Sequence, residues 1–112
     1  MPRYLISFDD GSMDHIMDVI EEVGAETQAV VAEAKAAGVW IWGGGLARQQ
    51  RAIVATDGTV IYGPSPETKP VIGGFSIIEV PTRDDALHWA AKIAASCRCA
   101  QEVREIMYDP GS

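Results

Sequence analysis

The chain has 112 residues, of which 47% are hydrophobic and 22% are charged, and its formal net charge is −7. This composition is typical of one globular domain, residues 1–112, that buries a core without disulfides or a metal ion. An acidic chain without a Lys/Arg cluster is repelled by nucleic-acid phosphates and anionic lipids, so neither is expected as a partner. The first six residues lack the apolar core of a signal peptide, which predicts a cytoplasmic location.

The N-terminal third is predicted to be a strand followed by helix. Residues 4–8 are a short apolar run rich in strand formers, and Asp9-Asp10-Gly11 ends it. Ser12 is expected to cap the helix that follows. Apolar residues spaced by three and four positions define its buried stripe: Met13, Ile16, Met17, Ile20, Val23, Thr27, Val30, Val31 and Ala34. Because Gly24 weakens a helix, we expect a bend there or a short helix followed by a longer one, and Gly38 is expected to end it.

The middle of the chain is predicted to hold a strand and a hairpin. The strand is expected at residues 39–42, and a bulge accounts for the three glycines at positions 43–45 that follow it. Apolar runs at residues 51–56 and 59–62 flank Asp57-Gly58. An Asp-Gly link between apolar runs predicts a hairpin with a type I′ turn.

The C-terminal third is predicted to be strand, helix and strand. Residues 75–80 form the first strand, and Thr82 has the character of a helix cap, with Asp85 three residues further on. The helix is expected to bury Ala86, Leu87, Trp89, Ala90, Ile93, Ala94 and Cys97, and the last strand is expected at residues 102–108. This order of elements predicts an α+β fold, with two main helices on one face of an antiparallel sheet.

Several strands are apolar on both faces, which predicts self-association. Ile77 and Ile78 point to opposite sides of their strand, yet two helices cover only one face of a sheet. The other face would be a large exposed apolar patch, which soluble monomers avoid, and twofold pairing with a second copy covers it. In the alternative interpretation, the hairpin folds over and covers this patch within one chain.

Residues 62–69, followed by Gly73-Gly74-Phe75, resemble the signature of the DGPF branch of the YCII-related family. In that signature, an Asp-Gly-Pro-Phe turn precedes Glu-Thr-Lys and a Gly-Gly-Phe strand; here Tyr62 replaces the Asp and Ser65 replaces the Phe. The resemblance extends over most of the chain. It implies a ferredoxin-like fold assembled as a dimeric α+β barrel, with no cofactor.

The same resemblance implies two kinds of function. Enzyme-like members use a His on the first helix with an Asp for an elimination of the dehydrochlorinase type. Other members accompany alternative sigma factors or are fused to them. This chain has no His between Ile16 and Gly38, and Gln28 lies where the family's His is expected.

The candidate catalytic residues are Asp14, His15 and Glu67. A carboxylate beside an imidazole orients it and raises its basicity, as a general base requires. The structural alternative for Asp14 and His15 is a polar helix start, where acids favour the positive end of the dipole. Glu67 follows a proline-rich loop and is the candidate acid or base of that loop; the alternative is a solvated ion pair with Lys69.

The candidate ligand-binding residues are Lys69, Thr68, Trp42 and Gly44. If the proline-rich loop folds over a cleft, Lys69 would meet an anionic group of a ligand. Trp40 and Trp42 alternate with Ile41, so they are expected to share one strand face as an aromatic wall, or else as part of the core or a dimer interface. Gly44 lies where a ligand could approach the backbone. No metal site is expected, because the two cysteines, read as free thiols, lack further ligands.

Two functional hypotheses follow. The first is a cofactor-free enzyme of lyase or hydrolase type that holds a small molecule in a cleft of a homodimer. The alternative is a non-catalytic regulatory or interaction module associated with transcription. If His15 lies beside a carboxylate inside a pocket, the enzyme is favoured, and an exposed His15 favours the module.

Overall fold

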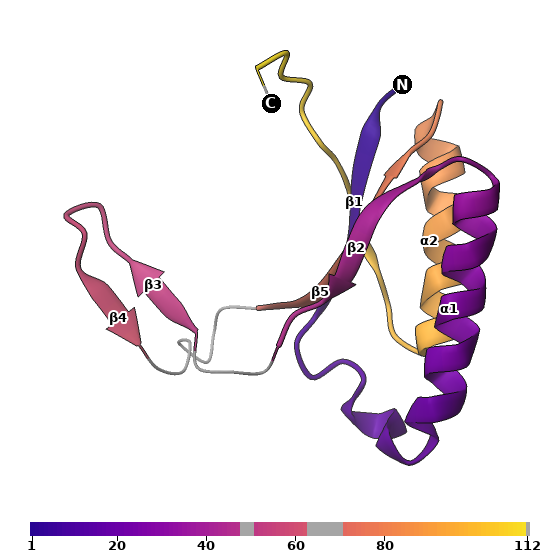
Figure 1. Cartoon of the computed structure of the whole chain (residues 1–112), viewed down its shortest axis with the longest axis horizontal. Coiled ribbons are helices and arrows are strands. Elements are labelled where there is room, and N and C mark those ends of the chain that lie inside the picture. The colour runs from indigo at the N-terminus through magenta and orange to yellow at the C-terminus, as the bar shows by residue number, and fades with distance from the viewer. Residues whose placement is uncertain (48–50, 63–70, 112) are drawn as a thin grey trace.

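The computed structural model describes residues 1–47, 51–62 and 71–111. Within these ranges, four strands form one antiparallel sheet in the order β2-β5-β1-β6. The strands are β1 (Arg3–Asp9), β2 (Trp40–Gly45), β5 (Ile72–Glu79) and β6 (Glu102–Glu105). The helices α1 (Ile20–Ala36) and α2 (Arg83–Cys97) lie side by side on one face of this sheet (Figure 1). The predicted ferredoxin-like α+β fold is confirmed.

The first helical segment is broken before α1 begins. A short 3₁₀ helix, η1 (Asp14–Val19), leaves helical geometry at Ile16, where φ is −117°. A short helix followed by a longer one is therefore confirmed, but the break precedes Gly24, which lies inside α1. The prediction that Ser12 caps a helix was wrong. Its N–H donates to the Asp9 carbonyl in a turn at 3.1 Å, and the residue preceding η1 is Met13.

Glycine ends α1 as predicted. Gly38 has φ of +75°, and its N–H donates to the Lys35 carbonyl at 3.0 Å. The N–H of Val39 donates to the Ala34 carbonyl at 3.1 Å. This pair of bonds is a Schellman motif, which satisfies carbonyls that the helix itself leaves unpaired.

A side-chain cap begins α2, also as predicted. The Thr82 hydroxyl accepts from the Asp85 N–H at 3.1 Å and donates to the Asp85 carboxylate at 2.9 Å. Along the helix, Ala86, Ala90, Ile93 and Cys97 are buried. The expectation that Leu87 is buried was wrong: it is 44% exposed, because it lies one position off this stripe.

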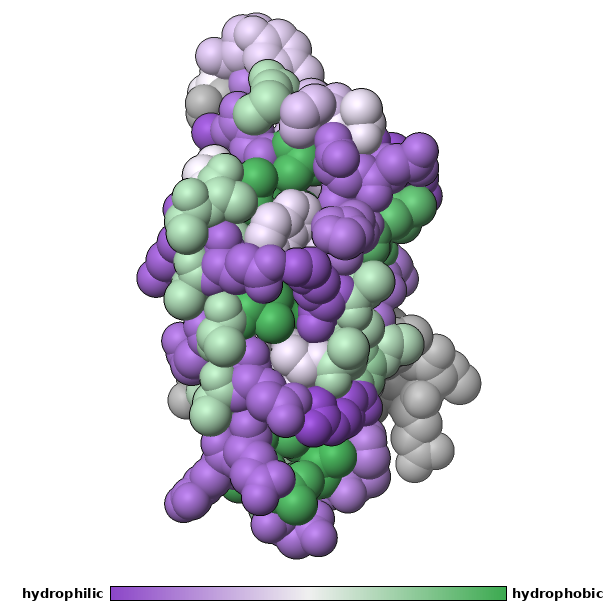
Figure 2. Space-filling view, turned by 90° about the vertical axis from the view of Figure 1, so that its right-hand side faces the viewer, coloured by the Kyte–Doolittle hydropathy of each residue, from purple (hydrophilic) through white to green (hydrophobic). Residues whose placement is uncertain are grey.

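The core lies between the sheet and the helices. Its buried side chains are Tyr4, Ile6, Ile16, Val23, Ile78, Val80, Ala86, Ala90, Ile93 and Cys97. Figure 2 shows the outer surface of the helical layer, where hydrophilic side chains separate small apolar patches. The helical layer therefore presents a mostly hydrophilic outer surface.

A bulge in β2 separates its two tryptophans. Trp40 pairs with Ile78 and Trp42 pairs with Ile77, so Ile41 is an extra residue on this strand. An extra residue shifts the alternation of side chains by one position. Trp40 therefore packs against the core, whereas Trp42 lies on the opposite face, 63% exposed. The prediction that both share one face was wrong, because it assumed unbroken alternation.

The predicted hairpin is confirmed, but its turn differs. β3 (Ala52–Val54) pairs with β4 (Val60–Tyr62), and both project away from the sheet and helices (Figure 1). The Gly58 N–H donates to the Ala55 carbonyl at 2.9 Å, and Gly58 alone among the turn residues has positive φ, +89°. This is a type I turn followed by a glycine bulge rather than a type I′ turn. The hairpin does not cover the sheet of its own chain.

Candidate functional site

The sheet face opposite the helices is the candidate functional surface, here called the open face. It is placed by the strand register, in which Leu5 pairs with Ile77, Ser7 with Phe75, and Gly44 with Phe75. Its members on the strands are Arg3, Leu5, Ser7, Trp42, Gly44, Phe75, Ile77, Glu79, Glu102 and Arg104, and Ile106 follows at the end of β6. The Trp42 ring meets the Phe75 ring edge to face, with centroids 5.4 Å apart. Within this face, Leu5, Trp42, Phe75 and Ile77 form an apolar strip, in which Trp42 is exposed and the other three are half-buried.

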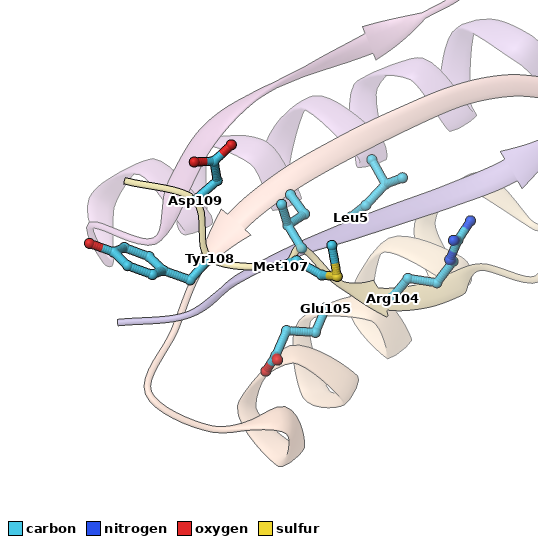
Figure 3. Close-up of a pocket in the computed structure, with 7 residues that line it drawn as sticks. Leu5, Arg104, Glu105, Met107, Tyr108 and Asp109 are labelled. Atoms are coloured by element: carbon cyan, nitrogen blue, oxygen red, sulfur yellow. The ribbon is translucent and has the colours of Figure 1, made fainter. Parts of the chain in front are cut away.

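An open groove lies where the open face meets the C-terminal segment. Its volume is ≈ 690 Å³, and its lining residues are Leu5, Arg104, Glu105, Ile106, Met107, Tyr108 and Asp109 (Figure 3). The last strand was predicted to reach Tyr108, but β6 ends at Glu105. Residues 106–109 therefore leave the sheet and form one side of the groove. The side chains of Met107 and Tyr108 are 87% and 90% exposed there.

Arg104 is the cation of the groove. It pairs with Leu5 across β1 and β6, and its Nε lies 3.9 Å from the Glu102 carboxylate, a loose and exposed ion pair. A guanidinium offers a planar set of donors that suits carboxylate, phenolate and carbonyl oxygens. The groove can therefore hold a flat apolar body against Leu5 and Ile106, with its oxygens directed to Arg104.

Glu105 belongs mainly to the other side of the sheet. Its carboxylate accepts a hydrogen bond from the Tyr4 hydroxyl at 3.2 Å. Burial raises the pKa of the Tyr4 hydroxyl, and the neighbouring Glu105 carboxylate raises it further. The Tyr4 hydroxyl thus remains protonated and anchors Glu105 at the edge of the core.

The structure does not bring the predicted site residues together. Asp14 and His15 are exposed on η1, which follows the far end of β1, and neither lines the groove. Trp42 and Gly44 lie on the open face but on β2, the edge strand opposite β6. The remaining predicted site residues, Glu67, Thr68 and Lys69, lie outside the described residues.

The groove residues were missed by sequence reasoning, although one signal for them exists. Val103 packs against the core, and Arg104 follows it on the opposite face, next to Ile106 two positions on. Alternation about Val103 therefore places Glu102, Arg104 and Ile106 on one face of this strand, a pattern that indicates a cation on the outer face of the sheet. What the sequence did not indicate is that the strand stops at Glu105, which shapes the groove.

The family model for the YCII-related domain matches residues 5–108. The chain belongs to the YCII-related domain family. This match does not distinguish the DGPF branch, so assignment to that branch stays a prediction. None of the described helices combines the length and apolar character needed to cross a bilayer.

A solved structure shares the fold. It is 5-chloro-2-hydroxyhydroquinone dehydrochlorinase from Burkholderia phenoliruptrix AC1100 in complex with 2,5-dihydroxybenzoquinone, with a TM-score of 0.54 and 17% identity. The similarity covers 99% of this chain and 98% of the dehydrochlorinase chain. At this identity, it shows the fold alone. No curated protein matches the sequence.

Proposed function

We propose that this YCII-related protein binds a small, flat molecule with oxygen substituents in the groove, and that a second copy of the chain covers the open face. The observation that carries the proposal is the position of Arg104, a weakly paired cation beside apolar Leu5 and Ile106 in a groove. Small-molecule sites commonly combine an apolar lining with a few polar groups that fix orientation. The dehydrochlorinase that shares the fold holds a dihydroxyquinone, a ligand of this chemical class.

Pairing with a second copy is supported by the apolar strip of the open face. Trp42 is 63% exposed on β2, and Ile106, just beyond the end of β6, is 40% exposed. Exposed apolar surface of this kind marks interaction sites in soluble proteins. A homodimer through this face would cover these side chains, in the manner of the predicted dimeric α+β barrel.

If the groove catalyses a reaction, the acid or base must be a residue other than the predicted pair Asp14 and His15. His15 is exposed and lies away from the groove, an observation that favours the second candidate function, a non-catalytic binding module. A cofactor-free lyase would instead need its acid or base from the groove itself. Tyr108 and Asp109 are the ionisable side chains of the C-terminal segment that lie there.

The test is binding of 2,5-dihydroxybenzoquinone and of hydroxybenzoates, measured by isothermal titration calorimetry. Arg104→Ala is expected to weaken binding about tenfold or more, because a hydrogen bond from a charged donor is lost. Lys35→Ala, which removes an exposed cation in the last turn of α1, is the matched control and should leave affinity unchanged. Equal affinities for wild type and Arg104→Ala would reject the groove as the site.

Turnover separates the two candidate functions. Release of chloride from a chlorinated hydroxyhydroquinone would favour the lyase, and binding without any product would favour the module. If turnover is present, Asp109→Asn and His15→Ala identify the acid or base. Loss of activity in His15→Ala, with full activity in Asp109→Asn, would instead identify His15 as the catalytic residue, as the sequence predicted.

A further inference from the structure

Two thiols are in contact where α2 turns toward β6. Cys97 is the last residue of α2 and only 3% exposed, whereas Cys99 is half-buried. Their sulfur atoms are 3.2 Å apart, and both cysteines are free. The intervening residue, Arg98, has the left-handed conformation, φ 60° and ψ 29°, which folds the chain back and brings Cys99 against Cys97.

We propose that Cys97 and Cys99 form a redox modification site, at which a small-molecule disulfide such as oxidised glutathione closes an intramolecular disulfide. A disulfide bond is about 2.05 Å long, so the two sulfurs need to approach by only about 1.2 Å. The left-handed residue between them already provides the backbone reversal. This site is separate from the groove and does not depend on the proposed ligand.

The chemistry balances as two successive exchanges. The more accessible Cys99 loses its proton and attacks one sulfur of the small disulfide, which forms a mixed disulfide and releases one thiol. The Cys97 thiol then loses its proton and attacks the Cys99 sulfur, which forms the protein disulfide and releases the second thiol. The two cysteines are oxidised by two electrons in total, and the small disulfide is reduced to two thiols.

Gln101 positions this dithiol. Its side-chain amide donates to the Cys97 sulfur at 3.1 Å and reaches the Cys99 sulfur at 3.5 Å and the Cys99 carbonyl at 3.3 Å. A donor aimed at both sulfurs stabilises the thiolate that each exchange step requires. Among the described residues, no further His, Cys, Asp or Glu completes a metal-binding group with the two thiols. Gln101 therefore contacts both sulfur atoms of the pair.

The experiment is oxidation of the reduced full-length protein with oxidised glutathione. After an acid quench, the protein is denatured, alkylated with N-ethylmaleimide and weighed by mass spectrometry. The expected product is monomeric on a non-reducing gel, carries no maleimide and is lighter by two hydrogens, and dithiothreitol restores two alkylated thiols. Two maleimides, two bound glutathiones or a disulfide-linked dimer would each overturn the proposal.

Single variants provide the controls. Cys97→Ser and Cys99→Ser each retain one thiol and are expected to stop at one bound glutathione. Gln101→Ala is expected to slow closure by roughly threefold at a fixed pH, because the donor to the thiolate is lost. An unchanged closure rate in Gln101→Ala would overturn the positioning role of Gln101. A Cys99→Ser variant that takes up glutathione as fast as Cys97→Ser would overturn the first attack by Cys99.

Discussion

The guanidinium of Arg98 donates two hydrogen bonds to the carboxylate of Glu26, at 2.5 and 3.1 Å, and so joins the end of α2 to α1. The same guanidinium donates to the carbonyls of Ala95 and Ser96 at 2.8 and 3.1 Å. A cation placed on the last carbonyls of a helix satisfies acceptors that the helix leaves unpaired. Arg98 therefore both ends α2 and fixes its position against α1.

This ion pair predicts a pH-dependent contribution to stability. The hydrogen bonds from Arg98 lower the pKa of the Glu26 carboxyl below its usual value of 4.5. Folding then favours the deprotonated form, so the contribution is fully present above the unfolded pKa and is lost as pH falls through the folded pKa. Glu26→Gln should lower the melting temperature at pH 7, and this effect should shrink as the pH falls below 4.5.

A double-mutant cycle checks the assignment. In an Arg98→Ala background, Glu26→Gln should leave the melting temperature at pH 7 unchanged, because the partner is already absent. A destabilisation of equal size in both backgrounds would show that Glu26 acts through another group.

Two helix glycines should respond in opposite directions to alanine. Gly24 lies inside α1 with nothing within 4 Å of an added Cβ, so Gly24→Ala should stabilise the protein by about 0.5–1 kcal/mol. Gly38 has φ of +75°, where an L side chain is strained, so Gly38→Ala should destabilise it by about 1–2 kcal/mol. Urea unfolding measures both changes. Destabilisation by Gly24→Ala would indicate that α1 is covered at that point.

Adjacent glycines on β2 test the predicted dimer. Gly44 lies on the open face and Gly45 on the helix side, and an added Cβ meets nothing within 4 Å at either position. If a second copy packs on the open face, Gly44→Val should weaken self-association by about tenfold or more, since overpacking a close interface is costly. Gly45→Val is the matched control and should associate like wild type.

Sedimentation equilibrium across a range of concentrations measures this association. A wild-type particle of 12.0 kDa at all concentrations would contradict the dimer. A dimer that tolerates Gly44→Val would place the interface on another surface.

The thiol pair predicts a steep pH dependence of oxidation. Burial, and then the adjacent Cys97, raise the pKa of the Cys99 thiol to about 12. The thiolate fraction, and with it the rate of reaction with oxidised glutathione, should rise about tenfold per pH unit between pH 7 and 9. Because Cys97 contributes to the raised pKa of Cys99, Cys97→Ser should react faster than the wild type at pH 7. A wild-type reaction rate that levels off below pH 9 would contradict the raised pKa of the Cys99 thiol.

The sequence predicted the elements where the deciding interactions are local. Thr82 caps α2 through a residue three positions away, and Gly38 ends α1 through bonds to the preceding turn. The position of the hairpin was likewise predicted from Asp57-Gly58. The type of its turn was not, because a type I turn with a glycine bulge and a type I′ turn use the same residues.

The candidate site could be predicted only in part. Gly44 and Trp42 lie on the sheet face opposite the helices, which the sequence predicted to be apolar. The groove, however, lies at the other edge of the sheet, beside β6. Asp14 and His15 are neighbours in sequence and lie together on η1. Neither of them lines the groove. Arg104 enters the site through its pairing with Leu5, about a hundred positions away, which no local pattern encodes.

The sequence by itself determined the order of strands and helices, the end of α1 at Gly38, the start of α2 at Thr82 and the apolar character of both sheet faces, because each depends on neighbours within a few residues. Only the tertiary structure decided that Trp40 and Trp42 face opposite ways, since the bulge at Ile41 arises from pairing with β5. The tertiary structure also decided which residues meet in the groove and that the two thiols touch. These relationships depend on long-range strand pairing and on a single left-handed residue, and neither leaves a periodic signal in the chain.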